Sequence, residues 1–137
     1  MNVLRFIIPK SLVEYITSDS TVRQGLEKMR FHGYVAIPVL DGEGVYVGTL
    51  KNDDILKYVL DGKSFDLGRA EGDSVMSIID RDSSTPLLHS ASFEELFERV
   101  REHNSVSVVD DRGCFIGLIL RRDVMNYLWK QYKKGLG

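Results

Sequence analysis

The sequence of 137 residues has a single cysteine, Cys114, so no disulfide can form within the chain. No apolar run approaches the ~20 residues that span a bilayer, and residues 1–10 lack the basic start, apolar stretch and cleavage site of a signal peptide. These absences exclude membrane insertion and predict a cytoplasmic protein. The net charge is only −2, so the chain also lacks the basic surplus that draws proteins to DNA or RNA, and no nucleic acid polymer is expected as a partner.

Motifs for catalysis and metal binding are missing as well. The sequence contains no G-x-x-x-x-G-K-[ST] loop, G-x-S-x-G elbow or H-E-x-x-H helix. His32, His89 and His103 form no cluster with metal-ligand spacing. Cys114 falls in a predicted strand with no histidine and aspartate arranged around it, which favours a small core residue over a nucleophile. We therefore expect no enzyme activity, no required cofactor and no metal.

An internal repeat is present and organises the chain. Residues of the first half recur in the second at one constant spacing, the one that separates Gly48 from Gly117. The matched pairs are Val39 with Val108, Leu40 with Val109, Asp41 with Asp110, Gly44 with Gly113, Asp54 with Asp123, and Tyr58 with Tyr127. The repeat predicts two similar structural units, the first with a lead-in over residues 1–62, a surface connector over 63–74, and the second with a C-terminal helix over 75–137.

Each copy shows the same order of predicted elements. Capping boxes at residues 21–24 and 92–95 start a helix with one apolar stripe. Two apolar strands joined by a glycine-containing turn follow, and a second helix begins near Asp54 or Asp123. The pattern predicts an α+β fold made of two βαββα units, packed together with pseudo-two-fold symmetry because neither half is comfortably stable alone.

This pattern resembles the cystathionine β-synthase (CBS) domain. The resemblance rests on the capped helix, the strand ending in Pro38 and Val39, and the two strand-to-helix junctions at residues 47–54 and 116–123. Two such domains in tandem resemble a Bateman module, and the match covers nearly the whole chain. With residues 6–10 and 32–34, the sequence is similar to the small stand-alone CBS proteins of Gram-positive bacteria, some of which bind cyclic di-AMP.

The resemblance implies a regulatory module that binds AMP, ADP, ATP, S-adenosylmethionine or a cyclic dinucleotide between its halves. In the family, each junction aspartate accepts hydrogen bonds from ribose hydroxyls, and backbone before Pro-Val of the other repeat borders the adenine. Carried over to this sequence, one site combines Asp123 with Lys10, Leu12, Tyr34, Val35, Ala36 and Ile37. The secondary site combines Asp54 and Lys51 with Val106, Ser107 and residues near Pro86. The family's usual Ser or Thr, three residues before the aspartate, is replaced by Lys51 and Leu120.

Charge at the two junctions distinguishes the sites. Arg121 and Arg122 lie at the start of a predicted helix, where the helix dipole disfavours cations by ~0.3–1 kcal/mol each, and a bound phosphate would offset that penalty. The alternative is that both arginines are solvated, one of them pairing with Asp123 or Asp111.

The first copy carries carboxylates at the equivalent junction. Asp53 and Asp54 are residues that helix capping favours without any ligand, although Asp54 remains a candidate for binding a ribose. The difference predicts one dominant nucleotide site per chain, on the Asp123 side. Near that site, Tyr34 is a candidate to stack on adenine or else a loop or core aromatic, and Lys10 is a candidate phosphate contact or else a solvated lysine.

The last predicted helix has an apolar arc wider than one buried stripe requires. Its members are Val124, Met125, Leu128, Trp129 and Tyr132. We expect part of this arc to contact a second copy in a homodimer, as CBS pairs similarly do; the alternative is that Trp129 and Tyr132 fold back onto their own sheet. A stand-alone sensor would signal to an unidentified protein target through differential affinity. The rival function is a ligand-free scaffold for dimerisation and protein–protein interaction.

Overall fold

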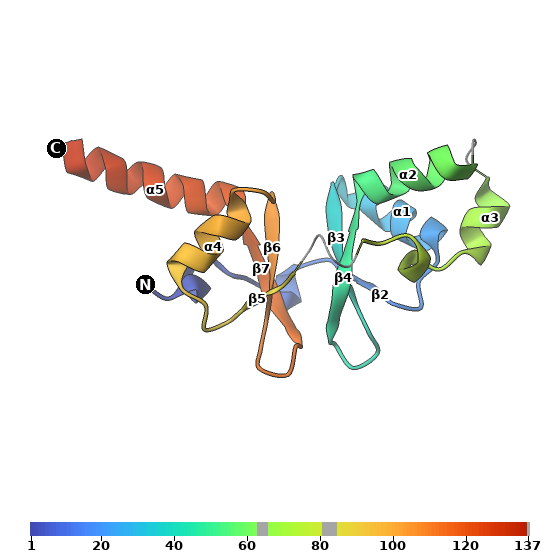
Figure 1. The fold of residues 1–137 in the computed structure, drawn as a ribbon, viewed down its shortest axis with the longest axis horizontal. Helices are drawn as coiled ribbons and strands as arrows, with labels where there is room; N and C mark the ends of the chain where they lie inside the picture. Colours follow the sequence, from blue (N-terminus) through green and yellow to red (C-terminus); the bar gives the residue numbers. More distant parts are fainter. Residues whose placement is uncertain (63–65, 81–84, 137) are drawn as a thin grey trace. The chain divides into compact units, whose positions relative to one another are not determined.

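A computed structural model describes residues 1–62, 66–80 and 85–136 (Figure 1). The chain forms two compact units, Glu14–Thr85 in one and Met1–Val13 with Pro86–Gly137 in the other. Each unit has its own sheet and its own helices.

The first unit contains the first copy of the repeat. In chain order its elements are β2 (Ile16–Thr17), α1 (Val22–His32), β3 (Ala36–Leu40), β4 (Tyr46–Lys51), α2 (Asn52–Gly62), α3 (Leu67–Gly72) and the 3-10 turn η3 (Val75–Ser77). Strand β3 lies between β2, to which it is parallel, and β4, to which it is antiparallel. The series from β2 to α2 is the predicted βαββα unit.

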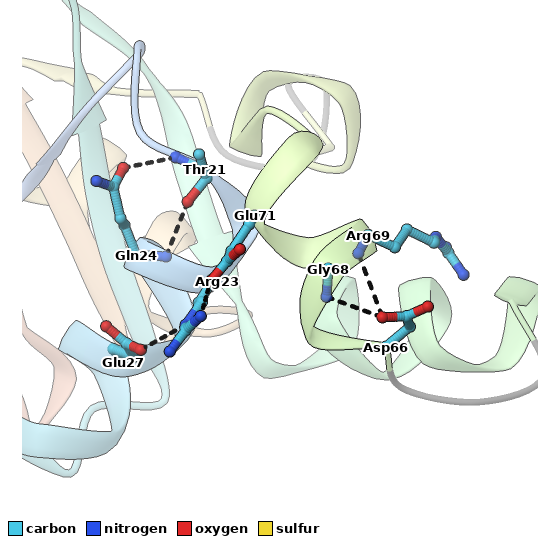
Figure 2. A network of polar contacts seen from close by, with 8 residues as sticks. All are labelled: Thr21, Arg23, Gln24, Glu27, Asp66, Gly68, Arg69 and Glu71. Atoms are coloured by element: carbon cyan, nitrogen blue, oxygen red, sulfur yellow. Dashed lines mark hydrogen bonds and ion pairs between the residues drawn. The ribbon is translucent and has the colours of Figure 1, made fainter.

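Helix α1 is fixed at both ends by local chemistry. The Thr21 hydroxyl accepts from the Gln24 backbone N–H at 3.1 Å, and the Gln24 side chain accepts from the Thr21 N–H at 2.9 Å (Figure 2). The helix ends at Gly33, whose φ of 68° is a left-handed conformation that glycine adopts without strain. The predicted capping box is confirmed.

Helix α1 packs closely against β4. A Cβ placed on Gly25 would lie 2.7 Å from Cδ2 of Leu50, so the helix approaches the sheet through this glycine. Met29 and Leu50 lie in the same buried cluster as Ile37 and Val39 of β3. Burial of such side chains, at ~1.5–3 kcal/mol each, holds the helix on the sheet.

Helix α3 departs from the expected surface connector. The carboxylate of Asp66 accepts from the N–H groups of Gly68 and Arg69, at 2.8 and 3.4 Å, and so caps a short helix in a glycine-containing segment (Figure 2). Residues 63–65 of the predicted connector lie outside the described residues.

The same helix contributes to the interior of its unit. Ala70 is fully buried in a cluster with Val22 and Tyr58, and Arg23 of α1 forms an ion pair with Glu71 (Figure 2). The described part of the predicted connector is therefore packed structure, because Ala70 is buried within the unit and Asp66 caps the helix.

The second unit contains the second copy together with the N-terminal segment. Its elements are the 3-10 turn η1 (Val3–Phe6), β1 (Ile8–Pro9), the 3-10 turn η2 (Lys10–Leu12), β5 (Leu87–Leu88), α4 (Phe93–Val100), β6 (Ser105–Val109), β7 (Phe115–Leu120) and α5 (Arg121–Leu136). The sheet order is β1-β7-β6-β5. The β6–β7 pair has a register shift between Val108 and Val109, at the repeat position where the first copy shifts between Val39 and Leu40.

The N-terminal lead-in differs most from the predicted division, which grouped it with the first copy. Strand β1 pairs antiparallel with β7, with Pro9 opposite Gly117, and Val3 and Phe6 lie in the second copy's buried cluster. A Cβ on Gly117 would lie 2.4 Å from the Ile8 carbonyl oxygen, so glycine is what lets the lead-in approach β7. A pairing between distant segments leaves no mark on local periodicity.

Helices α4 and α5 bury only part of their apolar surface. Ser92 caps α4 by accepting from the Glu95 N–H at 3.1 Å. Val124 of α5 is fully buried, whereas Met125, Trp129 and Tyr132 are each more than half exposed. The alternative that Trp129 and Tyr132 fold back onto their own sheet is therefore wrong. Cys114 is half-buried and forms a β-bridge immediately before β7, with its carbonyl accepting from the Asp110 N–H at 2.9 Å.

Candidate functional site

The candidate site is built around the junction where β7 ends at Leu120 and α5 begins at Arg121. Asp123 lies in the first turn of this helix and is half-buried. In the part of the chain that the structure describes, no hydrogen bond or ion pair involves its carboxylate. The oxygens of Asp123 are thus free to accept hydrogen bonds from a ligand.

Arg121, a predicted phosphate contact, already has partners within its own unit. Its Nε donates to the Val100 carbonyl at 2.6 Å, and its Nη2 donates to the Arg101 carbonyl at 3.4 Å. These carbonyls lie at the C-terminal end of α4, where a guanidinium satisfies acceptors that have no helical partner. Arg121 therefore fastens α5 to α4, and its guanidinium is turned to the protein rather than held ready for a phosphate.

Arg122 differs from its neighbour. Its side chain is exposed, and among the residues described it forms no ion pair and no hydrogen bond. Neither Asp123 nor Asp111 pairs with it; Asp111 instead lies 3.2 Å from Nε2 of His89. Of the two predicted phosphate-binding arginines, Arg122 is the one whose side chain remains accessible.

Lys10 and Leu12 are in the same unit as Asp123. They form η2, which follows β1 and packs against β7, the strand that leads into α5. The Lys10 side chain is half-buried and Leu12 is 73% exposed. The structure thus anchors two of the predicted ligand residues on the strand that positions Asp123.

The remaining predicted residues of this site belong to the other unit. Tyr34 is partly exposed and its ring stacks on His32, with 5.3 Å between centroids. Val35 is also exposed, and Ala36 is half-buried at the start of β3. Ile37 is fully buried in its own core, so its side chain is closed to a ligand.

The first-copy junction is chemically different. Asp54 is 8% exposed, and its Oδ2 accepts from the Lys51 backbone N–H at 2.8 Å. Burial raises the pKa of Asp54 above its ordinary value, and the hydrogen bond from Lys51 only partly opposes that rise. This carboxylate closes the strand-to-helix junction, as the capping interpretation expects. Val106 and Ser107, assigned to the same secondary site, are both buried in β6 of the other unit.

A groove near Asp123 was not predicted from the sequence. Asp123 lines a groove along α5 together with Arg5 and Tyr127, and Lys130 and Lys134 continue it. The α5 residues recur at i, i+4, i+7 and i+11, a helical pattern that was visible in the sequence. Arg5 comes from the opposite end of the chain, and no local pattern links it to α5.

Metal binding and membrane crossing require other features of a protein. The residues described contain no group of three His, Cys, Asp or Glu side chains placed to hold a metal ion. Within those same ranges, no helix has the length and apolar character to cross a membrane.

Comparison with solved structures finds the same fold in several proteins. A conserved protein of Geobacillus kaustophilus is 27% identical, with 96% of this chain and 98% of that chain covered and a TM-score of 0.86. CbpB of Listeria monocytogenes in complex with c-di-AMP is 23% identical, with 96% and 97% covered and a TM-score of 0.82. CBSX2 in complex with AMP is 20% identical, with 96% and 98% covered and a TM-score of 0.77.

No curated protein sequence matches the chain significantly. The family model of the CBS domain, in contrast, matches it twice, over residues 8–61 and 81–130. Each match covers one copy of the repeat that the sequence predicts, and each contains one of the junction aspartates. The chain therefore belongs to the CBS domain family, as a tandem pair.

Proposed function

We propose that this chain is a regulatory module that binds an adenine nucleotide, with cyclic di-AMP or AMP as the leading ligands, and that it does no chemistry on the nucleotide. The family membership supports the proposal, as do two proteins of the same fold whose structures contain c-di-AMP and AMP. The observation that carries it is the carboxylate of Asp123, which has no partner in the described part of the chain and lies at a helix start beside the exposed Arg122.

The chemistry of this junction suits a nucleotide. A carboxylate accepts hydrogen bonds from the two hydroxyls of a ribose, and such bonds to a charged group contribute ~1.5–3 kcal/mol. The first N–H groups of the 16-residue helix α5 and the guanidinium of Arg122 both attract phosphate. Lys10 and Leu12, which belong to the same unit as Asp123, are the proposed contacts for the rest of the ligand.

The first-copy site is proposed as secondary. Asp54 is buried and already accepts a hydrogen bond from Lys51, so binding a ribose there would require that bond to be exchanged. We therefore infer one dominant nucleotide per chain.

Isothermal titration calorimetry against AMP, ADP, ATP, S-adenosylmethionine and cyclic di-AMP tests the proposal. We expect heat from one of these ligands, and Asp123→Asn to weaken its binding about 10- to 100-fold, since the lost hydrogen bonds are charge-assisted. Arg122→Gln is expected to weaken binding less, by about two- to fivefold, because an exposed charge pair contributes little.

Asp54→Asn is the matched control for Asp123→Asn. It makes the same chemical change at the equivalent junction. We expect its nucleotide affinity to be within about twofold of that of the unchanged protein, because Asp54 already accepts a hydrogen bond from the Lys51 N–H. A loss in Asp54→Asn equal to that in Asp123→Asn would move the dominant site to the first copy. No heat from any ligand of the panel would refute nucleotide sensing.

The second candidate function is a ligand-free scaffold, and two observations favour it. Lys51 and Leu120 replace the hydroxyl residue that the family usually has at each junction. The helices of the second copy also expose a face of Phe97, Met125, Trp129 and Tyr132. In either function we propose that this face forms a homodimer; in the leading one, a protein target would distinguish the arrangements that a bound nucleotide favours.

Sedimentation equilibrium tests the dimer. Trp129→Glu places a charge in the exposed apolar face and is expected to shift the chain to monomer at micromolar concentration. Gln131→Glu adds the same charge to α5 outside that face and is expected to leave the dimer intact. A monomeric unchanged protein would contradict the dimer proposal without affecting the nucleotide proposal.

A further inference from the structure

A groove of about 590 Å³ follows the side of α5 that faces the N-terminal turn η1. It begins at Asp123 and continues past Tyr127 and Lys130 to Lys134, with Arg5 contributed by η1. Lys133 also lines it. The groove lies wholly within the second unit, and its walls come from the two ends of the chain.

The charge of the groove is opposite to that of the protein. Four cations line it, Arg5, Lys130, Lys133 and Lys134, against the single carboxylate of Asp123, whereas the chain as a whole carries −2. Within the described ranges none of these four cations forms an ion pair. Elsewhere the exposed charges are commonly paired, as Arg101 is with Glu98 at 3.0 Å.

The helix dipole accounts for only two of these four cations. Lys133 and Lys134 lie in the last turn of α5, where a cation is favoured by the helix dipole. Lys130 precedes that turn, and Arg5 belongs to another element. The guanidinium carbon of Arg5 lies 4.5 Å from the centre of the Tyr127 ring, a cation–π contact that holds it over the groove.

The groove and the exposed apolar face are on different sides of α5. Each residue of the groove on α5 is paired with a residue of the apolar face two positions later, and two positions correspond to about 200° around the helix axis. The pairs are Asp123 with Met125, Tyr127 with Trp129, and Lys130 with Tyr132. Lys133 borders both surfaces, since its Nζ lies 5.3 Å from the centre of the Trp129 ring, whereas a partner that contacts Arg5, Lys130 and Lys134 need not compete with a copy of the chain bound to the apolar face.

The spacing of the cations indicates the shape of the partner. From Asp123 to Lys134 the groove follows α5 for about 16 Å, at ~1.5 Å per residue. The cations occupy only part of this length, from Arg5 at the level of Tyr127 to Lys134, which is about 10 Å along the helix. An extended chain of about three residues, at ~3.3 Å each, covers the cations, and about five would cover the whole groove.

We propose that this groove binds an acidic, extended segment of a partner protein, whose carboxylates pair with Arg5, Lys130, Lys133 and Lys134. The groove shares Asp123 with the proposed nucleotide site, but the four cations that would bind the segment are not among the proposed nucleotide contacts.

Fluorescence anisotropy with a labelled octapeptide of alternating glutamate and alanine tests the proposal on the full chain. We expect binding that weakens as salt is raised, and no binding of the matched octapeptide in which glutamine replaces glutamate. The double substitution Lys130→Gln with Lys134→Gln is expected to weaken binding about two- to thirtyfold, since each exposed ion pair contributes modestly. Arg5→Gln is expected to weaken it as well.

The control is Arg101→Gln with Arg112→Gln, which removes two exposed cations of the same unit outside the groove and should leave binding within twofold. Charge reversal is the second test: Lys130→Glu with Lys134→Glu should lose the glutamate peptide and gain an octapeptide of alternating lysine and alanine. The proposal is overturned if the glutamate peptide fails to bind at millimolar concentration, or if the control double loses as much affinity as the groove double. Tighter binding of an eight-nucleotide single-stranded DNA or of tripolyphosphate would overturn it too.

Discussion

Gly117→Ala is predicted to destabilise the second unit by displacing the N-terminal lead-in. The added Cβ would lie 2.4 Å from the Ile8 carbonyl oxygen and 2.6 Å from Cγ1 of Ile7, both far inside van der Waals contact. The backbone oxygen belongs to β1 and can retreat only by weakening its pairing with β7.

The magnitude follows from what that retreat disturbs. Overpacking of a well-packed site costs about 1–3 kcal/mol, and each weakened backbone hydrogen bond costs about 0.5–1.5 kcal/mol. Val3 and Phe6, both buried in the second core, resist larger movement. We therefore expect the free energy of unfolding to fall by about 2–4 kcal/mol.

Urea denaturation followed by circular dichroism measures this loss. Gly135→Ala is the matched control, because no atom lies within 4 Å of its added Cβ; there alanine should be neutral or stabilising by up to ~1 kcal/mol. Ile7→Ala should recover part of the loss in Gly117→Ala, since the Ile7 side chain contributes two of the three closest atoms. A Gly117→Ala protein as stable as the unchanged one would refute the close approach of β1 to β7.

Three further predictions concern the junctions and the core. Arg121→Met should lower the free energy of unfolding by about 1–3 kcal/mol, because the hydrogen bonds to the Val100 and Arg101 carbonyls are lost. Nucleotide affinity should change by less than threefold. A large loss of affinity without a loss of stability would instead assign Arg121 to the nucleotide site. Burial raises the pKa of Asp54 in the folded state, so the folded chain binds this proton more tightly than the unfolded chain does. The contribution of Asp54 to stability is therefore present at low pH and is lost as the pH rises through the folded pKa. Urea titrations from pH 3 to 7 should show the free energy of unfolding of the unchanged protein falling relative to that of Asp54→Asn. The same pH dependence of the unfolding free energy in both proteins would contradict the prediction. Leu96→Ala removes a fully buried side chain of α4 and should cost about 2–5 kcal/mol by the same assay, whereas Leu88→Ala, at an exposed position of β5, should cost less than 1 kcal/mol.

The elements that sequence predicts well are those specified by neighbouring residues. The Thr21 capping box and the strand pairs depend on short patterns that the repeat displays twice. The CBS family followed from the same patterns, since the junction glycine and aspartate recur together in both copies.

What sequence failed to predict depends on contacts between distant segments. Nothing near Pro9 indicates that it will pair with Gly117, and a short helix docked by Ala70 is hidden by the glycines around it. The direction of the Arg121 side chain depends on the carbonyls that α4 leaves unpaired nearby, which only the assembled unit brings within reach.

The two junction aspartates show the same limit within the candidate site. Asp54 and Asp123 occupy equivalent places in the repeat, yet the first is buried against the Lys51 N–H and the second has no partner in the part of the chain described. The charges of the neighbouring residues predict different nucleotide binding at the two junctions, whereas the burial of Asp54 could be read only from the packed unit.

The most direct test of the account is a titration of the ¹⁵N-labelled chain with cyclic di-AMP and with AMP, followed by amide chemical shifts. We predict that at least one of the two ligands shifts the amides of Arg122 and Asp123 at a stoichiometry of one per chain, and that Asp123→Asn abolishes these shifts at the same concentrations. Unchanged spectra with both ligands, or shifts centred on Asp54 with none at Asp123, would contradict the central claim.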